Sequence, residues 1–154
     1  MNPTLYLIFG NANSGKSSLV RSLTGLRTSD NINLSFIGQN QTIFFVRMPS
    51  LQEGDFIIPD KLDSYMNSQG IGIKNFIFPI RIIGTKVCPF NAEDYLIKIR
   101  DWGFQVKGVV LLNPTIPDFY MSYNLDLTDT WIKNPLQLPR NYIAMKVRTK
   151  WGLE

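Results

Sequence analysis

The sequence contains no histidine and only one cysteine, Cys88, among its 154 residues. One cysteine cannot form a disulfide within the chain. The lack of histidine excludes zinc sites built from Cys and His, Ser–His and Cys–His catalytic pairs, and imidazole pH switches. Any catalysis must therefore use lysine, arginine, carboxylate, hydroxyl or backbone groups.

Long hydrophobic runs are absent as well. The most apolar tract, residues 76–83, is interrupted by Pro79 and Arg81, whereas a membrane span needs about 18 or more uninterrupted apolar residues. Residues 1–4 carry no basic side chain and the apolar run behind them covers only residues 5–9, which does not fit a secretory signal. We therefore expect a cytoplasmic protein with no membrane span.

The length and composition are those of an ordinary globular domain. Hydrophobic residues make up 44% of the chain and charged residues 18%, which excludes disordered and low-complexity classes and predicts one domain over residues 1–154. The net charge is +4, from 16 basic and 12 acidic residues. This charge weakly favours an anionic partner such as a nucleotide, a nucleic acid or a membrane surface.

Apolar periodicity and turn residues predict alternating strands and helices. Only residues 38–41 separate two of the strands, which are therefore expected to form an antiparallel hairpin. The order of elements predicts an α/β fold in three layers, with a mainly parallel sheet, one antiparallel hairpin strand and helices on both faces. The predicted strands are 5–9, 33–37, 42–46, 76–83, 106–112 and 141–149, and the predicted helices are 16–24, 59–69, 91–102 and, in a turn-rich stretch, 127–133.

Residues 10–17, G-N-A-N-S-G-K-S, match the phosphate-loop pattern G-x-x-x-x-G-K-[ST]. A chance match is expected in roughly one in two hundred chains of this length, and this match lies between a predicted strand and a predicted helix, as the motif requires. In such a loop, backbone N–H groups and a helix dipole bind phosphate. Lys16 is predicted to reach the β- and γ-phosphates and Ser17 to bind Mg²⁺. The predicted contact residues are Gly10, Asn11, Ala12, Asn13, Ser14, Gly15, Lys16, Ser17 and Ser18.

The run from Gly15 to Gly25, G-K-S-S-L-V-R-S-L-T-G, is similar to the segment that opens many P-loop NTPases of the small GTPase-like branch. The resemblance is specific over about residues 4–25, extends to the layout of elements up to about residue 50, and concerns only the architecture up to about residue 112. It implies a P-loop NTPase-like sheet, binding of a nucleoside triphosphate with Mg²⁺, and hydrolysis used as a conformational switch.

Two motifs of that family are missing from the chain. Its D-x-x-G, which places an aspartate behind Mg²⁺, is replaced by R-M-P-S at residues 47–50. Its guanine-reading [NT]-K-x-D is matched neither by T-K-V-C at residues 85–88 nor by N-P-T-I at residues 113–116. These departures leave ATP and GTP equally open and predict hydrolysis that is slow or needs a partner.

Other residues are candidates for the missing roles, and each also has an ordinary structural explanation. Arg47 follows a strand and is predicted, with Lys16, as a catalytic residue that brings charge to the γ-phosphate, or alternatively pairs with a local acid. Glu53 and Asp55 can bring a carboxylate to the metal or water, or be solvated loop acids. Thr28 and Ser29 fall where the family has its switch threonine, or are simply polar loop residues.

Basic residues recur at even positions within and directly beside the predicted last strand, 141–149. With a period of two they share one face, which predicts either a nucleic-acid contact surface or an edge strand protected by charge. The basic residues are Arg140, Lys146, Arg148 and Lys150, and Tyr142 lies among them.

Three functions therefore remain open. The first is Mg²⁺-dependent binding of a nucleoside triphosphate with slow or partner-stimulated hydrolysis. The second is a small nucleotide or metabolite kinase, in which Arg81, Arg100 or the loop after Leu112 holds the acceptor. The third is a degenerate, non-catalytic P-loop protein that contacts a protein partner or nucleic acid.

Overall fold

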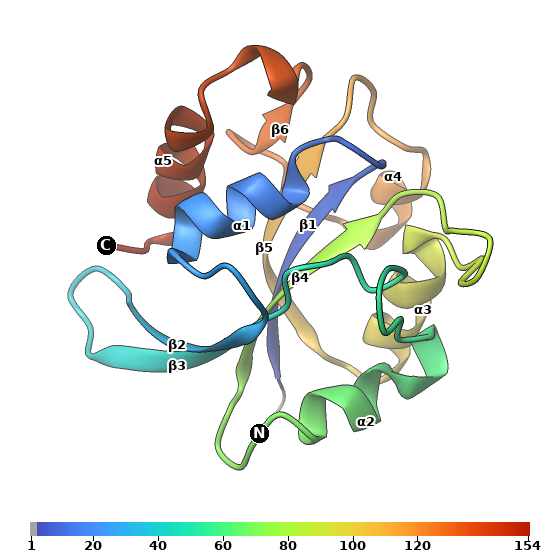
Figure 1. Ribbon diagram of the computed structural model, residues 1–154, viewed down its shortest axis with the longest axis horizontal. Coiled ribbons are helices and arrows are strands. Elements are labelled where there is room, and N and C mark those ends of the chain that lie inside the picture. The colour runs from blue at the N-terminus through green and yellow to red at the C-terminus, as the bar shows by residue number, and fades with distance from the viewer. Residues whose placement is uncertain (1–2) are drawn as a thin grey trace.

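The computed structural model describes residues 3–154, and in this part of the chain one sheet lies between two layers of helices (Figure 1). The strands are β1 (Thr4–Gly10), β2 (Asp30–Ser35), β3 (Gln41–Val46), β4 (Asn75–Arg81), β5 (Gln105–Leu112) and β6 (Trp131–Ile132). The helices are α1 (Lys16–Thr24), α2 (Leu62–Asn67), α3 (Ala92–Asp101), α4 (Phe119–Tyr123) and α5 (Arg140–Trp151), with short 3-10 turns η1 (Pro59–Lys61) and η2 (Pro135–Gln137).

The six strands of the described residues follow the order β2-β3-β4-β1-β5-β6. β2 and β3 pair antiparallel, and all other neighbours pair parallel. The predicted α/β class, the mainly parallel sheet and the hairpin are confirmed. β4 lies between β1 and β3, so Gly10 at the end of β1 is opposite Arg81 at the end of β4.

Both faces of the sheet are buried, as the continuous apolar run of β1 predicts. Tyr6 and Ile8 of β1 pack with α1 and α5, whereas Leu5, Leu7 and Phe9 pack in the cluster that contains α2, α3 and Tyr120 of α4. This alternation along one strand produces two apolar cores, one on each side of the sheet.

The predicted last strand, 141–149, is wrong, because Arg140–Trp151 forms helix α5. Ile143 and Val147 are buried, as the alternating pattern expected, but Met145 between them is 55% exposed. Ala144 and Trp151 are buried instead. The buried positions therefore follow helical spacing, and Ile143 and Val147 satisfy both periods because they are four residues apart.

The predicted helix at 127–133 is also wrong. Its last part contains strand β6, and Asp129 before it has a φ of 66° that no regular helix accepts. The helix of this region is α4, earlier in the chain, and it ends at Asn124 with a φ of 52°.

Helix 16–24 is confirmed, helix 91–102 is present as α3, and helix 59–69 is divided into η1 and α2. No helix within residues 3–154 has the combined length and apolarity of a membrane span.

Candidate functional site

The glycine-rich loop, residues 10–17, connects β1 to α1 at the carboxyl edge of the sheet. Its backbone turns sharply, with a φ of 60° at Asn13 and 93° at Gly15. A Cβ at Gly10 would lie 2.3 Å from Ser14 Oγ, so the loop can curl only over a glycine at this position. The two glycines of the motif therefore serve the geometry of the loop itself.

The amino end of α1 opens into this loop. No side chain caps α1, and the first N–H groups of any helix have no carbonyl partner within that helix. The Ser14 N–H donates to the Asn11 carbonyl at 3.2 Å, which closes the loop. Uncapped N–H groups and the positive end of the helix dipole thus face the same space, an arrangement that can hold an anion.

Lys16, the first residue of α1, is buried, with 6% of its surface exposed. Its Nζ donates to the Asn11 carbonyl at 2.8 Å and to Ser14 Oγ at 3.5 Å, and none of the ion pairs in residues 3–154 includes it. Burial lowers the pKa of Lys16 to about 8; nearby Arg81 lowers it further and Glu53 opposes the shift. The loop thus holds an incompletely compensated cation.

A cavity of about 360 Å³ lies over the loop and is lined by residues 12–18 together with Glu53 and Arg140. Arg140 is the first residue of α5, and a Cβ at Gly15 would lie 2.8 Å from its Cζ. Its Nη1 donates to the Pro135 carbonyl at 2.9 Å. Lys16 and Arg140, the first residues of α1 and α5, therefore line the same cavity. The sequence alone does not predict that Arg140 belongs to this site.

A second cavity, of about 420 Å³, adjoins the first, since Ala12 and Ser14 line both. It lies past the carboxyl ends of β5 and β6, the usual place for ligands in α/β sheets. No carboxylate is among its lining residues, which are Asn11, Ala12, Ser14, Leu112, Asn113, Pro114, Lys133, Asn134, Pro135, Leu136 and Gln137.

The loop after β3 brings oxygen atoms to the other side of the glycine-rich loop. Ser17 Oγ lies 3.5 Å from the Met48 carbonyl oxygen, and Glu53 lines the first cavity. Asp55 is exposed and is not among the residues that line this cavity. Within residues 3–154 no three Asp, Glu, Cys or His side chains gather as a metal cluster.

The two hydroxyl candidates, Thr28 and Ser29, are exposed residues of the segment between α1 and β2. Ser29 Oγ accepts a hydrogen bond from the Met48 N–H at 2.8 Å. Ser29 therefore ties this segment to the loop after β3, and neither hydroxyl lines the cavity over the glycine-rich loop.

Arg47 does not lie beside the glycine-rich loop, because β4 separates its strand from β1. Its side chain is buried, with 4% exposed. Its guanidinium donates to the carbonyls of Glu53 at 2.8 Å and Asp55 at 3.2 Å, to those of Pro49 and Ser50, and to the Tyr65 hydroxyl. These contacts fold residues 47–55 into the loop that carries Glu53. They assign Arg47 to the architecture of that loop and give no support for a direct catalytic role.

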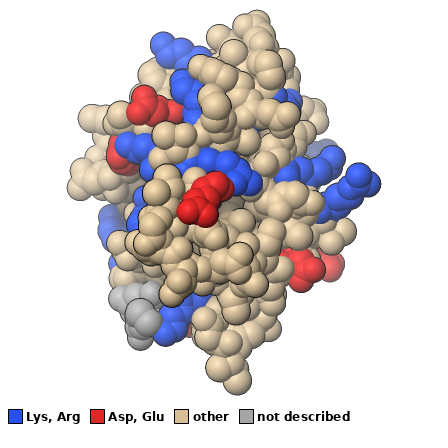
Figure 2. Space-filling view, turned by 90° about the vertical axis from the view of Figure 1, so that its left-hand side faces the viewer, with Lys and Arg blue, Asp and Glu red and all other residues tan. Residues whose placement is uncertain are grey.

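The basic residues predicted to form one stripe are dispersed, because they lie on a helix where successive residues are about 100° apart. Arg140 turns to the glycine-rich loop, Arg148 donates to the carbonyls of Leu23 and Glu154, and Lys150 pairs with Asp126 at 3.1 Å. Figure 2 shows basic and acidic side chains interspersed on the face that it draws, without one continuous basic patch.

The chain matches no protein-family model, no curated protein and no solved structure.

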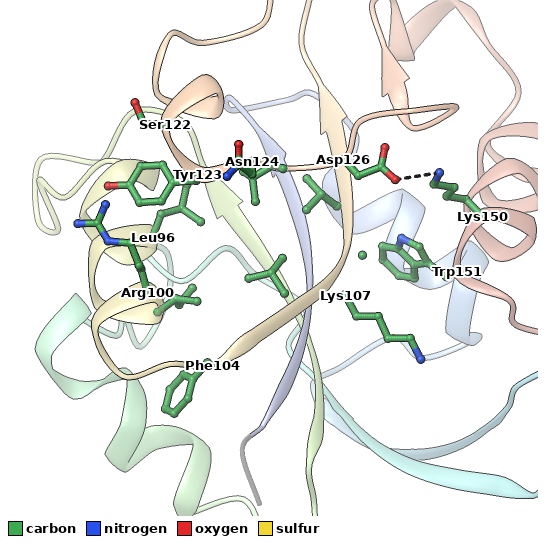
Figure 3. Close-up of a pocket in the computed structure, with 15 residues that line it drawn as sticks. Leu96, Arg100, Phe104, Lys107, Ser122, Tyr123, Asn124, Asp126, Lys150 and Trp151 are labelled. Atoms are coloured by element: carbon green, nitrogen blue, oxygen red, sulfur yellow. Dashed lines mark ion pairs between the residues drawn. The ribbon is translucent and has the colours of Figure 1, made fainter.

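A third cavity, of about 430 Å³, lies elsewhere, along the open edge of β5 (Figure 3). β6 pairs only with Leu111 and Leu112, so the amino half of β5 has no strand on the side away from β1. A bulge at Lys107 interrupts its pairing with β1, and bulges with charged residues commonly protect such edges. Arg100 lines this cavity with its guanidinium 5.0 Å from the Tyr123 ring centroid. Arg81, opposite Gly10 at the end of β4, is not among the residues that line this cavity, so the structure does not bring Arg81 and Arg100 together.

Replacing Lys16 with methionine is expected to stabilise the protein without ligand, because the fold no longer buries a charged ammonium group. The folded pKa is lowered from 10.5 to about 8, so the cost is complete below about pH 8 and disappears as the pH approaches 10.5. Urea denaturation should show the variant more stable at neutral pH, by about 1–3 kcal/mol, with a smaller difference near pH 10. A difference independent of pH would contradict this explanation.

Proposed function

We propose that this protein binds a nucleoside triphosphate with Mg²⁺ at the glycine-rich loop, as a P-loop protein with slow or partner-stimulated hydrolysis. The observation that carries the proposal is the buried Lys16, held at the uncapped amino end of α1 under a cavity. Burying an ammonium group without a carboxylate partner is costly. A site that awaits an anionic ligand explains why the fold accepts this cost.

The second cavity supports a nucleotide over a simple phosphate. It shares Ala12 and Ser14 with the first cavity, so a ligand can extend from one to the other without leaving the protein surface. Leu112, Pro114 and Pro135 give it apolar walls, against which a base can pack. In this proposal the phosphates lie over residues 12–18 and the base lies beyond Ala12.

The affinities for ATP and GTP should differ by less than about tenfold. Guanine is selected by a carboxylate that accepts two hydrogen bonds, and none lines the second cavity. The lack of such an acceptor forfeits about 1–3 kcal/mol of discrimination. Competition of ATP and GTP for a fluorescent nucleotide measures the ratio. A preference for either base well above tenfold would show that a group outside this cavity reads it.

The residues near Ser17 fit a magnesium ion that arrives with its nucleotide. Ser17 offers one hydroxyl and Glu53 one carboxylate, which suits an ion held mainly by phosphate oxygens and water. When bound, Mg²⁺ would neutralise phosphate charge. Ser17 would hold it from the α1 side and Glu53 from the loop after β3.

Slow turnover follows from the scarcity of groups that can orient water. Glu53 is the one carboxylate among the described residues that line the cavity over the glycine-rich loop, and Lys16 and Arg140 are cations. The scarcity of carboxylates equally favours a second candidate, a protein that binds nucleotide without hydrolysing it. Phosphate release under single-turnover conditions, measured for wild type and Glu53→Gln, distinguishes slow hydrolysis from nucleotide binding without hydrolysis.

A thermal-shift panel tests the proposed function directly. The panel contains ATP, GTP, their diphosphates and deoxynucleoside monophosphates, each with and without Mg²⁺. A ligand at about 100 times its Kd raises the free energy of unfolding by about 2.7 kcal/mol. We expect the triphosphates with Mg²⁺ to give the largest shifts. Identical midpoints with and without every nucleotide would contradict the proposal.

A further inference from the structure

We propose that Arg140, at the start of α5, binds the phosphates of the nucleotide as a second cation of the glycine-rich loop site. This inference rests on the proposed function and extends it, because Arg140 lies outside the sequence motif. It also replaces the expectation that Arg140 belongs to a nucleic-acid surface.

The guanidinium of Arg140 lies at the glycine-rich loop. It packs directly on Gly15, where a Cβ would lie 2.8 Å from Cζ and Nη1 and 2.9 Å from Nη2. Any residue other than glycine at position 15 would therefore displace Arg140. Arg140 also lines the same cavity as Lys16, Ser17 and Ser18, so its charge faces the space above the first turn of α1.

The guanidinium of Arg140 is held in place, but no carboxylate neutralises its charge within the described residues. Nη1 donates to the Pro135 carbonyl at 2.9 Å, and no ion pair of the described residues includes Arg140. Arginine has five N–H donors, so the remaining donors are available to phosphate oxygens. Pro135 fixes the side chain in advance, which reduces the entropy lost when a ligand binds.

Helix α5, which carries Arg140, packs firmly on α1. α5 packs on α1 through Ile143, Ala144 and Val147, which belong to the same apolar core as Leu19 and Val20. Arg148 further joins the two helices by donating to the Leu23 carbonyl. Lys16 and Arg140 thus stand at the starts of two helices that pack against each other.

Equilibrium binding of a fluorescent ATP analogue to wild type, Arg140→Ala, Arg140→Lys and Lys146→Ala tests the inference. Lys146→Ala removes one positive charge from the same helix at a residue that stacks on Tyr142, so it controls for net charge. We expect Arg140→Ala to weaken binding about 10- to 100-fold and Arg140→Lys to restore only part of it, because lysine lacks the two-pronged donor geometry. Lys146→Ala should bind within about twofold of wild type.

The same measurement without Mg²⁺ separates ligand contact from a purely structural role. If Arg140 neutralises phosphate charge, the loss of ATP-analogue affinity caused by Arg140→Ala should be larger without Mg²⁺. Inorganic pyrophosphate should also displace the analogue less well from Arg140→Ala than from wild type. Equal affinity of wild type and Arg140→Ala would overturn the inference and leave the proposed function intact. Failure of wild type to bind any nucleotide would overturn both. If Arg140→Ala does not fold, Arg140→Gln, which keeps part of the aliphatic stem and a polar end without the charge, replaces it with the same expected loss.

Discussion

Lys16→Ala should reduce the affinity for nucleoside triphosphate by about 100-fold or more while the protein remains folded. Among the described residues, Lys16 Nζ donates hydrogen bonds only to the Asn11 carbonyl and Ser14 Oγ of its own loop. Phosphate oxygens can replace these acceptors. Losing a charge-assisted contact to an anion in a buried site accounts for an effect of this size. Titration with a fluorescent nucleotide measures it, and circular dichroism checks the fold.

Lys86→Ala provides the matched control for that measurement. Lys86 is exposed in the loop between β4 and α3, so its removal changes the net charge by the same amount without touching the glycine-rich loop. Its affinity should equal that of wild type. Equal affinities of wild type and Lys16→Ala would remove the proposed phosphate site.

Arg47→Ala should destabilise the protein by about 2–4 kcal/mol, because the carbonyls of residues 49–55 lose their buried donor. The side chain is 4% exposed and reaches four carbonyls and the Tyr65 hydroxyl. Arg47→Lys should lie between wild type and Arg47→Ala, since an ammonium group has fewer donors. Urea denaturation compares the three proteins with Arg27→Ala, an exposed arginine whose loss should change stability by less than about 0.5 kcal/mol.

This prediction also separates the two roles considered for Arg47. A structural role predicts a lower free energy of unfolding, whereas a group that acts on the γ-phosphate predicts slower hydrolysis at unchanged stability. A stable Arg47→Ala protein that hydrolyses nucleotide at least about tenfold more slowly would restore the catalytic role. We expect the opposite result.

The sequence predicts most of the structural features that depend on residues close together in the chain. The apolar run of β1, the glycine pattern and the helical spacing of Leu19, Val20 and Leu23 lie within twenty residues, and the structure has strand, loop and helix there. The hairpin is local as well, because a short turn with Gly38 at a φ of 75° connects its strands. Such features depend on contacts between neighbours in the chain.

The sequence does not predict what depends on distant contacts. Ile143, Met145 and Val147 fit a strand as well as a helix, and only packing against α1 leaves Met145 outside. The contact between Arg140 and Gly15 joins the two ends of the chain. Likewise, nothing local to β4 indicates that it inserts between β1 and β3, which moves Arg47 away from the predicted site.

The sequence likewise does not predict which of the two acids, Glu53 or Asp55, reaches the site. Both acids follow β3, and the sequence treats them alike. Arg47 holds both of their carbonyls, and the resulting turn leaves Glu53 at the cavity and Asp55 exposed. In the turn held by the buried Arg47 guanidinium, Glu53 is therefore the carboxylate that is available to the site.

The most direct test of the account is to follow the backbone amide resonances of the protein by NMR while ATP or GTP is added with Mg²⁺. Binding through the N–H groups of the glycine-rich loop predicts that the largest shifts occur at residues 12–18, with Arg140 and Glu53 next, and that Lys16→Ala abolishes them. Unchanged amide signals across residues 10–18 at saturating nucleotide, or changes confined to the cavity beside β5, would contradict it.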